Sequence, residues 1–176
     1  MTSVTQAVSR RRLTPAARRA VLTVHIIASV GLLGDCALIV ATNVRAAATA
    51  DPQLAASSYE LLGMFSLLFG IPLSFASLLS GVALGLGSKW GVLRYRWVTA
   101  KLVLNLSVIL AGALVIGPHT SAFADGHDGS ATVLILASAY DVVALGLASV
   151  LSVYKPGRAR DRAAPPRTTP APAPLS

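Results

Sequence analysis

The sequence predicts an all-α integral membrane protein, a bundle of four transmembrane helices with both termini in the cytoplasm. Its 176 residues are 54% hydrophobic and 12% charged, with a mean hydropathy of +0.67, whereas soluble domains carry about 25% charged residues. Four apolar stretches are each long enough to cross the ~30 Å hydrocarbon core of a bilayer. The basic residues also gather in three segments, which an even number of crossings places on one side of the membrane.

Residues 1–19 form a basic tail with few apolar side chains, so we expect this segment to be disordered or to lie on anionic lipid. The segment SRRRL resembles a twin-arginine export signal. The apolar run that follows is longer than the roughly 7–15 residues of the apolar part of a cleaved signal. We therefore predict an uncleaved anchor. The first predicted span covers residues 21–44, within a membrane domain of residues 20–155.

A loop over residues 45–58 is predicted next, because Asp51-Pro52 is typical of a turn. The second span, residues 59–87, is longer than the ~20 residues needed, so we expect it to tilt or bend. Pro72 predicts a bend, because its ring clashes with the carbonyl four residues earlier and it cannot donate a backbone hydrogen bond. Small residues recur every four positions at Ser77, Gly81 and Gly85. This spacing lets another helix approach closely, either within the chain or in a partner.

A basic, aromatic turn follows the second span and leads into the third span, residues 97–117. Aromatic side chains favour the membrane interface, and lysine and arginine can extend toward headgroup phosphates. We therefore predict a lipid interface and keep a ligand site as the alternative. The interfacial side chains are Lys89, Trp90, Arg94, Arg96, Trp97 and Lys101.

A polar loop over residues 118–130 precedes the fourth span, residues 131–154, and residues 156–176 form a disordered tail rich in Pro, Ala and Arg. The two tails, Lys155 and the turn from Ser88 to Lys101 hold every Lys and Arg except Arg45. The positive-inside rule then places both tails and the central turn in the cytoplasm. We expect a multi-pass protein of a bacterial cytoplasmic membrane. Because the net charge of +8 sits at helix flanks and tails, we expect membrane lipids rather than nucleic acid as partners.

Two carboxylates occur inside predicted spans, Asp35 in the first and Asp141 in the fourth. A carboxylate at the centre of a span costs ~3 kcal/mol, so such a residue suggests a function. Helical rise puts both about 20 Å from the cytoplasmic ends of their spans, at the level of Ser74. We predict a polar cluster of these three residues. Two nearby carboxylates in a medium of low dielectric constant cannot both ionise cheaply, so one would be protonated. The alternative is that each Asp only ties helices together by hydrogen bonds.

Three histidines are candidate metal ligands: His25 in the first span, and His119 and His127 in the polar loop. Imidazole binds haem iron and divalent transition metals. For His25 the alternative is a hydrogen-bonded packing role, and for the loop histidines a solvated loop. The single cysteine, Cys36, excludes an internal disulfide framework.

Three stretches together carry a family resemblance. They are VHIIASVGLLG in the first span, SGVALGLGSKWGVLRYRWVTAKLVL from Ser80 to Leu104, and LSVYKPGR at the end of the fourth span. They resemble a bacterial family of predicted integral membrane proteins of unknown function. The resemblance covers roughly Val21 to Arg158 and implies the fold and the membrane location, but no activity. The first span is also similar in pattern to copper-resistance protein D and its relatives, membrane proteins linked to copper handling.

The sequence contains no phosphate-cradling glycine loop, nucleophile elbow, zincin motif or CxxC pair. We therefore expect neither an enzyme nor a cofactor. The leading hypothesis is a non-enzymatic membrane component that associates with a partner protein or with copies of itself. The alternative is a small transporter, or a protein that handles protons or metal ions through the intramembrane Asp residues. A haem or quinone redox module is a third hypothesis.

Overall fold

Four long helical rods make up the described part of the chain, residues 13–87, 96–125, 127 and 130–154 of a computed structural model. The first rod is α1 (Pro15–Ala48). The second runs through α2 (Pro52–Phe65), η1 (Ser66–Gly70) and α3 (Ile71–Leu86). The third runs through α4 (Arg96–Ala111), η2 (Gly112–Ile116) and α5 (Gly117–Ala124), and the fourth is α6 (Ala131–Tyr154). Each rod is long and apolar enough to span a membrane. The predicted all-α bundle of four spanning helices is therefore confirmed.

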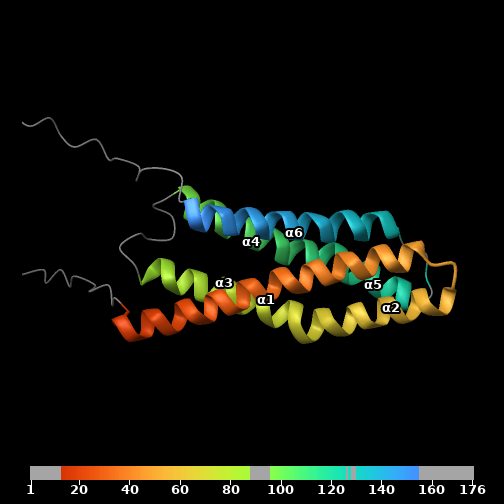
Figure 1. Ribbon diagram of the computed structural model, residues 1–176, viewed down its shortest axis with the longest axis horizontal. Helices are drawn as coiled ribbons and strands as arrows, with labels where there is room; N and C mark the ends of the chain where they lie inside the picture. The colour runs from red at the N-terminus through yellow and green to blue at the C-terminus, as the bar shows by residue number, and fades with distance from the viewer. Residues whose placement is uncertain (1–12, 88–95, 126, 128–129, 155–176) are drawn as a thin grey trace, which may run out of the picture.

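The rods run up and down beside one another (Figure 1). The start of α1, the end of α3, the start of α4 and the end of α6 lie together at what we call the terminal end. The turns after Ala48 and Ala124 lie at the opposite end, the loop end. Helix α1 packs most extensively on α3 and α6, α4 packs on α6, and α2 pairs with α5. A closed ring of four rods results, in which each rod has two neighbours.

The first two rods begin where the sequence caps them. The Thr14 hydroxyl accepts a hydrogen bond from the Ala17 N–H at 3.2 Å, and Pro15 occupies the first helical position. The Asp51 carboxylate accepts hydrogen bonds from Gln53 and Leu54, again with a proline next. A capping side chain satisfies amides that have no partner in the first turn, and proline needs none there.

The helices extend beyond the predicted spans, so both predicted loops were too long. Helix α1 continues to Ala48 and α2 starts at Pro52, which leaves a three-residue connection in place of a loop over residues 45–58. Asp51-Pro52 acts as a helix start rather than as an extended turn. In the predicted loop 118–130, residues up to Ala124 are helical, because Pro118 lies in the first turn of α5, where proline is tolerated.

Two π-helical turns interrupt the second and third rods, each just before a proline. In η1 the Ile71 N–H bonds to the Ser66 carbonyl, and in η2 the Gly117 N–H bonds to the Gly112 carbonyl. The next residue in each case is a proline, which cannot donate a backbone hydrogen bond, and the wider turn accommodates its ring. Helices α3 and α4 each contain 16 residues. Both turns therefore lie about 24 Å from the terminal end.

The bundle has two apolar clusters inside and an apolar surface outside. The loop-end cluster centres on Leu134 and Leu62, and the mid-bundle cluster on Leu32 and Val108. The Tyr59 ring stacks on Phe123 with 4.5 Å between centroids, which joins α2 to α5. Large apolar side chains are exposed on every rod, as a lipid solvent requires. Internal packing, rather than exclusion of apolar surface from water, therefore holds the rods together.

We expect Leu134→Ala to destabilise the bundle by about 2–5 kcal/mol, because it leaves a cavity in a site that cannot collapse freely. Leu134 is 0% exposed in the loop-end cluster. Reversible unfolding in mixed detergent micelles, followed by circular dichroism, measures the change. Leu136→Ala is the matched control, since Leu136 lies on the same helix and is 65% exposed. Equal losses in the two variants would contradict the assigned core.

Candidate functional site

Buried polar side chains follow the inside of the bundle from one end toward the other. They come from all four rods and alternate with the two apolar clusters. We call this set the polar axis. Its members with less than one tenth of their surface exposed are Asp35, Asn43, Ser58, Ser74, Ser77, Ser80, Thr120, Ser138 and Asp141.

Asp35 lies on the inner face of α1, opposite η1. It is 8% exposed, and its Oδ2 atom is buried without a hydrogen-bond partner among the described residues. A Cβ atom added to Gly70, the last residue of η1, would stand 3.0 Å from this oxygen. Glycine thus lets the backbone of the π-helical turn approach the carboxyl group closely. The first carboxyl of the polar axis therefore lies at the level where the second rod is interrupted.

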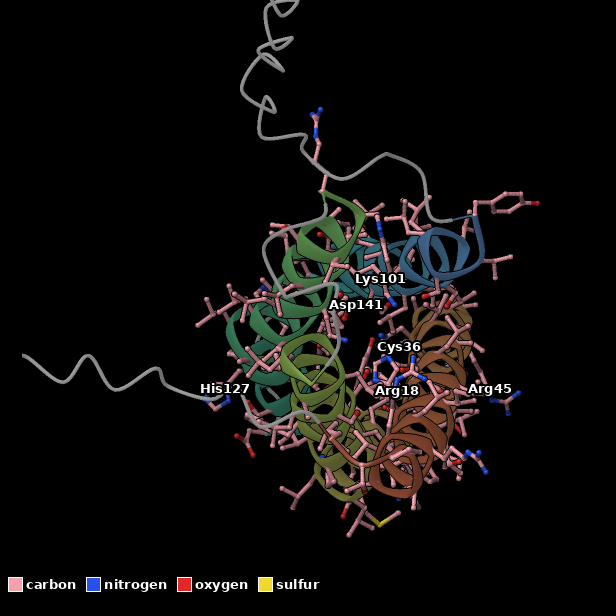
Figure 2. The ribbon with its side chains drawn as sticks, turned by 90° about the vertical axis from the view of Figure 1, so that its left-hand side faces the viewer. Arg18, Cys36, Arg45, Lys101, His127 and Asp141 are labelled. Carbon is pink, nitrogen blue, oxygen red and sulfur yellow. The ribbon has the colours of Figure 1, made fainter. Side chains whose placement is uncertain are left out.

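Asp141 projects into the bundle from α6 and is 3% exposed. Its Oδ1 atom is also buried and lacks a partner within the described ranges. Asp141 and Asp35 both lie close enough to the Cys36 side chain to interact with it electrostatically. Cys36 and Asp141 lie inside the ring of helices in the view along the bundle (Figure 2). Two carboxyl groups from different rods therefore lie within electrostatic range of one buried thiol.

Ser74, the third member of the predicted cluster, is buried on α3 with 9% of its surface exposed. It lies one turn beyond Gly70, toward the terminal end. The structure therefore buries all three residues that the sequence singled out. Hydrogen-bonded ties would pair the carboxyl oxygens, but Asp35 Oδ2 and Asp141 Oδ1 are unpaired within the described part of the chain. An unpaired buried carboxyl oxygen can take up a proton or contact a cation.

Sequence reasoning missed a second polar cluster, nearer the terminal end. His25 Nδ1 lies 3.1 Å from the Ser77 carbonyl oxygen and 3.0 Å from Ser80 Oγ. Ser77 Oγ also contacts Ser29 Oγ at 3.0 Å and accepts a hydrogen bond from Asn105 at 3.3 Å. The spacing of His25 and Ser29 along one helix face was a signal for this cluster. Their partners on α3 and α4 could not be read from the sequence.

A third polar contact lies on the loop-end side of the carboxyls. Asn43 on α1 donates to Ser138 Oγ on α6 at 3.4 Å, while Asn43 Oδ1 has no partner among the described residues. Asn43 is two turns beyond Asp35 on the same helix. Polar groups are thus available on both sides of the two carboxyls.

The three histidines are not brought together. His25 belongs to the polar cluster near the terminal end, whereas His119 Nδ1 contacts the Val115 carbonyl oxygen at 2.9 Å within the third rod. His127 is exposed and follows α5, which ends at the loop end. Among the residues that the structure describes, no group of three or more His, Cys, Asp or Glu side chains could hold a metal ion.

The predicted lipid-interface residues have varied positions. Lys89, Trp90 and Arg94 lie outside the described residues. Arg96 is exposed and Trp97 is half-buried at the start of α4. Lys101 is half-buried and lies within electrostatic range of His25. In the view along the bundle, Lys101 is labelled within the ring of helices (Figure 2).

The small-residue face of α3 packs against other helices of the same chain. Ser77 is 2% exposed and contacts α1 and α4. A Cβ atom on Gly81 would stand 3.1 Å from His25 Cε1. Of the two arrangements that this spacing allows, packing within the chain is the one present at Ser77 and Gly81.

Four apolar rods around a polar axis define a multi-pass integral membrane protein. Residues 19–154 match the family described as "Predicted integral membrane protein (DUF2269)", and the chain belongs to this family, whose function is unknown. The resemblance to such a family is therefore confirmed, whereas the likeness to copper-resistance protein D stays a prediction. No curated protein and no solved structure matches the chain.

Proposed function

We propose that this protein is a non-enzymatic transporter that carries protons across a bacterial cytoplasmic membrane, with Asp35 and Asp141 as the proton-binding groups. Its terminal end faces the cytoplasm, because the basic tails and the basic turn belong to that end. One observation carries the proposal. Two buried carboxyl groups on different rods each have an oxygen atom without a hydrogen-bond partner in the described part of the chain.

A proton carrier needs a group that accepts and releases a proton inside the membrane, together with polar groups on either side. Carboxyl groups inside spans are expensive and typically belong to such paths. Asn43 and Ser138 lie toward the loop end, and Ser74 and Ser77 lie toward the terminal end. Hydroxyl and amide groups can relay a proton or hold a bridging water. The polar axis therefore has polar groups on both sides of the carboxyls, which supports a proton path between them.

The competing hypothesis of a partner protein loses its sequence support at Ser77 and Gly81, because these residues pack against α1 and α4 of the same chain. The exposed apolar surface is accounted for by lipid. No observation in the described residues favours a haem or quinone module over a proton path.

Flux through proteoliposomes tests the proposal. Wild-type protein under an imposed potential is expected to acidify or alkalinise the lumen, as reported by an enclosed pH-sensitive dye. Asp35→Asn and Asp141→Asn should each reduce the rate to that of protein-free liposomes, because an amide keeps the shape but cannot exchange a proton.

Asp125→Asn is the matched control, since Asp125 is an exposed carboxylate at the end of α5. This variant should transport like the wild type. Equal flux in wild type, Asp35→Asn and Asp141→Asn, or no wild-type flux above empty liposomes, would remove the proposed function.

A further inference from the structure

Lys101 is a half-buried cation that has no acidic partner among the described residues. It is half-buried on α4, and no acidic side chain among the described residues forms an ion pair with it. The titratable side chain within electrostatic range of Lys101 is His25, which cannot offset a positive charge. Asp35 lies ten residues beyond His25 on α1, about 15 Å farther from the terminal end. A charged group within a span is costly unless it is paired, so Lys101 needs an anion that the described chain does not supply.

The hydrogen bonds around His25 leave one ring nitrogen open. Ser80 donates its hydroxyl hydrogen to the Ala76 carbonyl, so Ser80 Oγ acts as an acceptor toward His25 Nδ1. The Ser77 carbonyl near the same nitrogen can only accept. Nδ1 therefore carries the hydrogen, and the neutral ring presents the lone pair of Nε2. No hydrogen bond of the described residues involves Nε2.

Asn105 adds a second hydrogen-bond acceptor that has no partner among the described residues. It lies four residues after Lys101, on the same face of α4. Its amide nitrogen donates to Ser77 Oγ at 3.3 Å, while its Oδ1 atom is buried without a partner within the described ranges. The cluster thus offers one ammonium donor beside two acceptors, His25 Nε2 and Asn105 Oδ1. A ligand that fits it carries a negative charge and at least one hydroxyl hydrogen.

Arg18 extends the positive charge toward the terminal end. It lies two turns before His25 on the same face of α1, about 10 Å nearer the end of the bundle. Arg18 is exposed on α1 at the terminal end, the end that faces the viewer in Figure 2. An anion approaching from the terminal end meets Arg18 before Lys101. Successive positive charges of this kind raise the local concentration of anions.

We propose that Arg18, His25, Lys101 and Asn105 form a binding site for a phosphate group that carries hydroxyl hydrogens. The phosphate oxygens accept from the Lys101 ammonium group, and the hydroxyls donate to His25 Nε2 and Asn105 Oδ1. Inorganic phosphate has this chemistry through its P–OH groups. The headgroup of phosphatidylglycerol has it through its glycerol hydroxyls. The site is distinct from the carboxyl groups of the proposed proton path and does not depend on that function.

Two binding measurements on the full chain in neutral detergent test the site and separate the two sources. Titration calorimetry measures binding of inorganic phosphate, and native mass spectrometry counts phosphatidylglycerol molecules retained from a defined lipid mixture. We expect one bound phosphate group per chain in one of the two arms. Binding in the first arm identifies a soluble anion, and retention in the second identifies a lipid headgroup.

Lys101→Gln should weaken binding about tenfold or more, because it removes the charged donor. Asn105→Asp should weaken binding to a similar extent for a different reason. Its new carboxylate lies four residues from Lys101 and pairs with it in place of the ligand. This second variant keeps the size of the side chain, so it carries the test if Lys101→Gln does not fold.

Arg45→Gln is the control, because it removes one exposed positive charge from the last turn of α1, at the loop end and away from the proposed site. It should bind like the wild type. The proposal is overturned if the wild type binds neither probe. It is also overturned if folded Lys101→Gln or Asn105→Asp binds as tightly as the wild type, or if Arg45→Gln loses as much. The last result would indicate diffuse attraction at the membrane interface.

Discussion

Replacing Asp141 with leucine is expected to stabilise the bundle and to abolish proton movement. Asp141 is 3% exposed, and its Oδ1 atom has no hydrogen-bond partner among the described residues. A carboxyl group held this way costs about 2–3 kcal/mol inside a membrane, and leucine has nearly the same shape without the polar atoms. Unfolding in mixed micelles should therefore shift to higher denaturant content, while proteoliposome flux falls to background.

In Asp141→Leu, stability is expected to rise while proton flux falls, and these opposite changes distinguish a functional carboxyl group from a structural one. If Asp141 were a structural tie, Asp141→Leu would destabilise the bundle, since removing one side of a buried hydrogen bond leaves its partner unpaired. Asp125→Leu serves as the control, because Asp125 is exposed and its replacement should leave both readouts unchanged. A destabilised Asp141→Leu variant would refute the assignment of Asp141 as an unpaired group.

Substituting leucine for Gly81 is expected to separate α1 from α3 and to cause a large loss of stability. A Cβ atom at Gly81 would already stand 3.1 Å from His25 Cε1, so a longer side chain must displace the imidazole ring. Overpacking of this kind costs about 1–3 kcal/mol. Loss of the His25 contacts with Ser77 and Ser80 adds about 1–3 kcal/mol more. Unfolding in mixed micelles measures the sum.

Gly34→Leu provides the matched control for this substitution. Gly34 lies on α1, it is exposed, and a Cβ atom there meets nothing within 4 Å. Leucine should be tolerated at that position and favoured slightly, because glycine is a poor helix former. If Gly34→Leu and Gly81→Leu destabilise the protein equally, the close contact between Gly81 and His25 does not hold α1 to α3.

Residue patterns predicted the four crossings well but placed their ends less accurately. Apolar length identified each rod, because a segment must exceed ~20 residues to cross a bilayer. Asp51-Pro52 was interpreted as a turn and the polar segment 118–130 as a loop, yet Pro52 and Pro118 each lie in the first turn of a helix. A proline is compatible with the first helical turn as well as with a loop, so its presence alone does not distinguish a helix start from a loop. The π-helical turns before Pro72 and Pro118 were likewise not predicted.

The candidate site was predicted in part. Asp35 and Asp141 were recognisable because a carboxyl group within an apolar run is rare and costly. The cluster of His25, Ser77 and Asn105 was not recognised as a unit, because serine and asparagine within a span are common and carry no strong signal alone. Their hydrogen bonds join positions 25, 77 and 105 on three helices.

The sequence by itself determined that the chain forms four membrane-spanning helices, and it predicts that their basic flanks lie on one side. These properties follow from the composition and length of single segments, which lipid and water sort independently of one another. Tertiary structure alone decided which polar groups meet. Packing of the rods leaves one oxygen each of Asp35 and Asp141 without a partner among the described residues, brings Lys101 within electrostatic range of His25, and closes α3 onto α1 at Gly81. Such contacts depend on the rotation and level of each helix relative to its neighbours, which no single segment encodes.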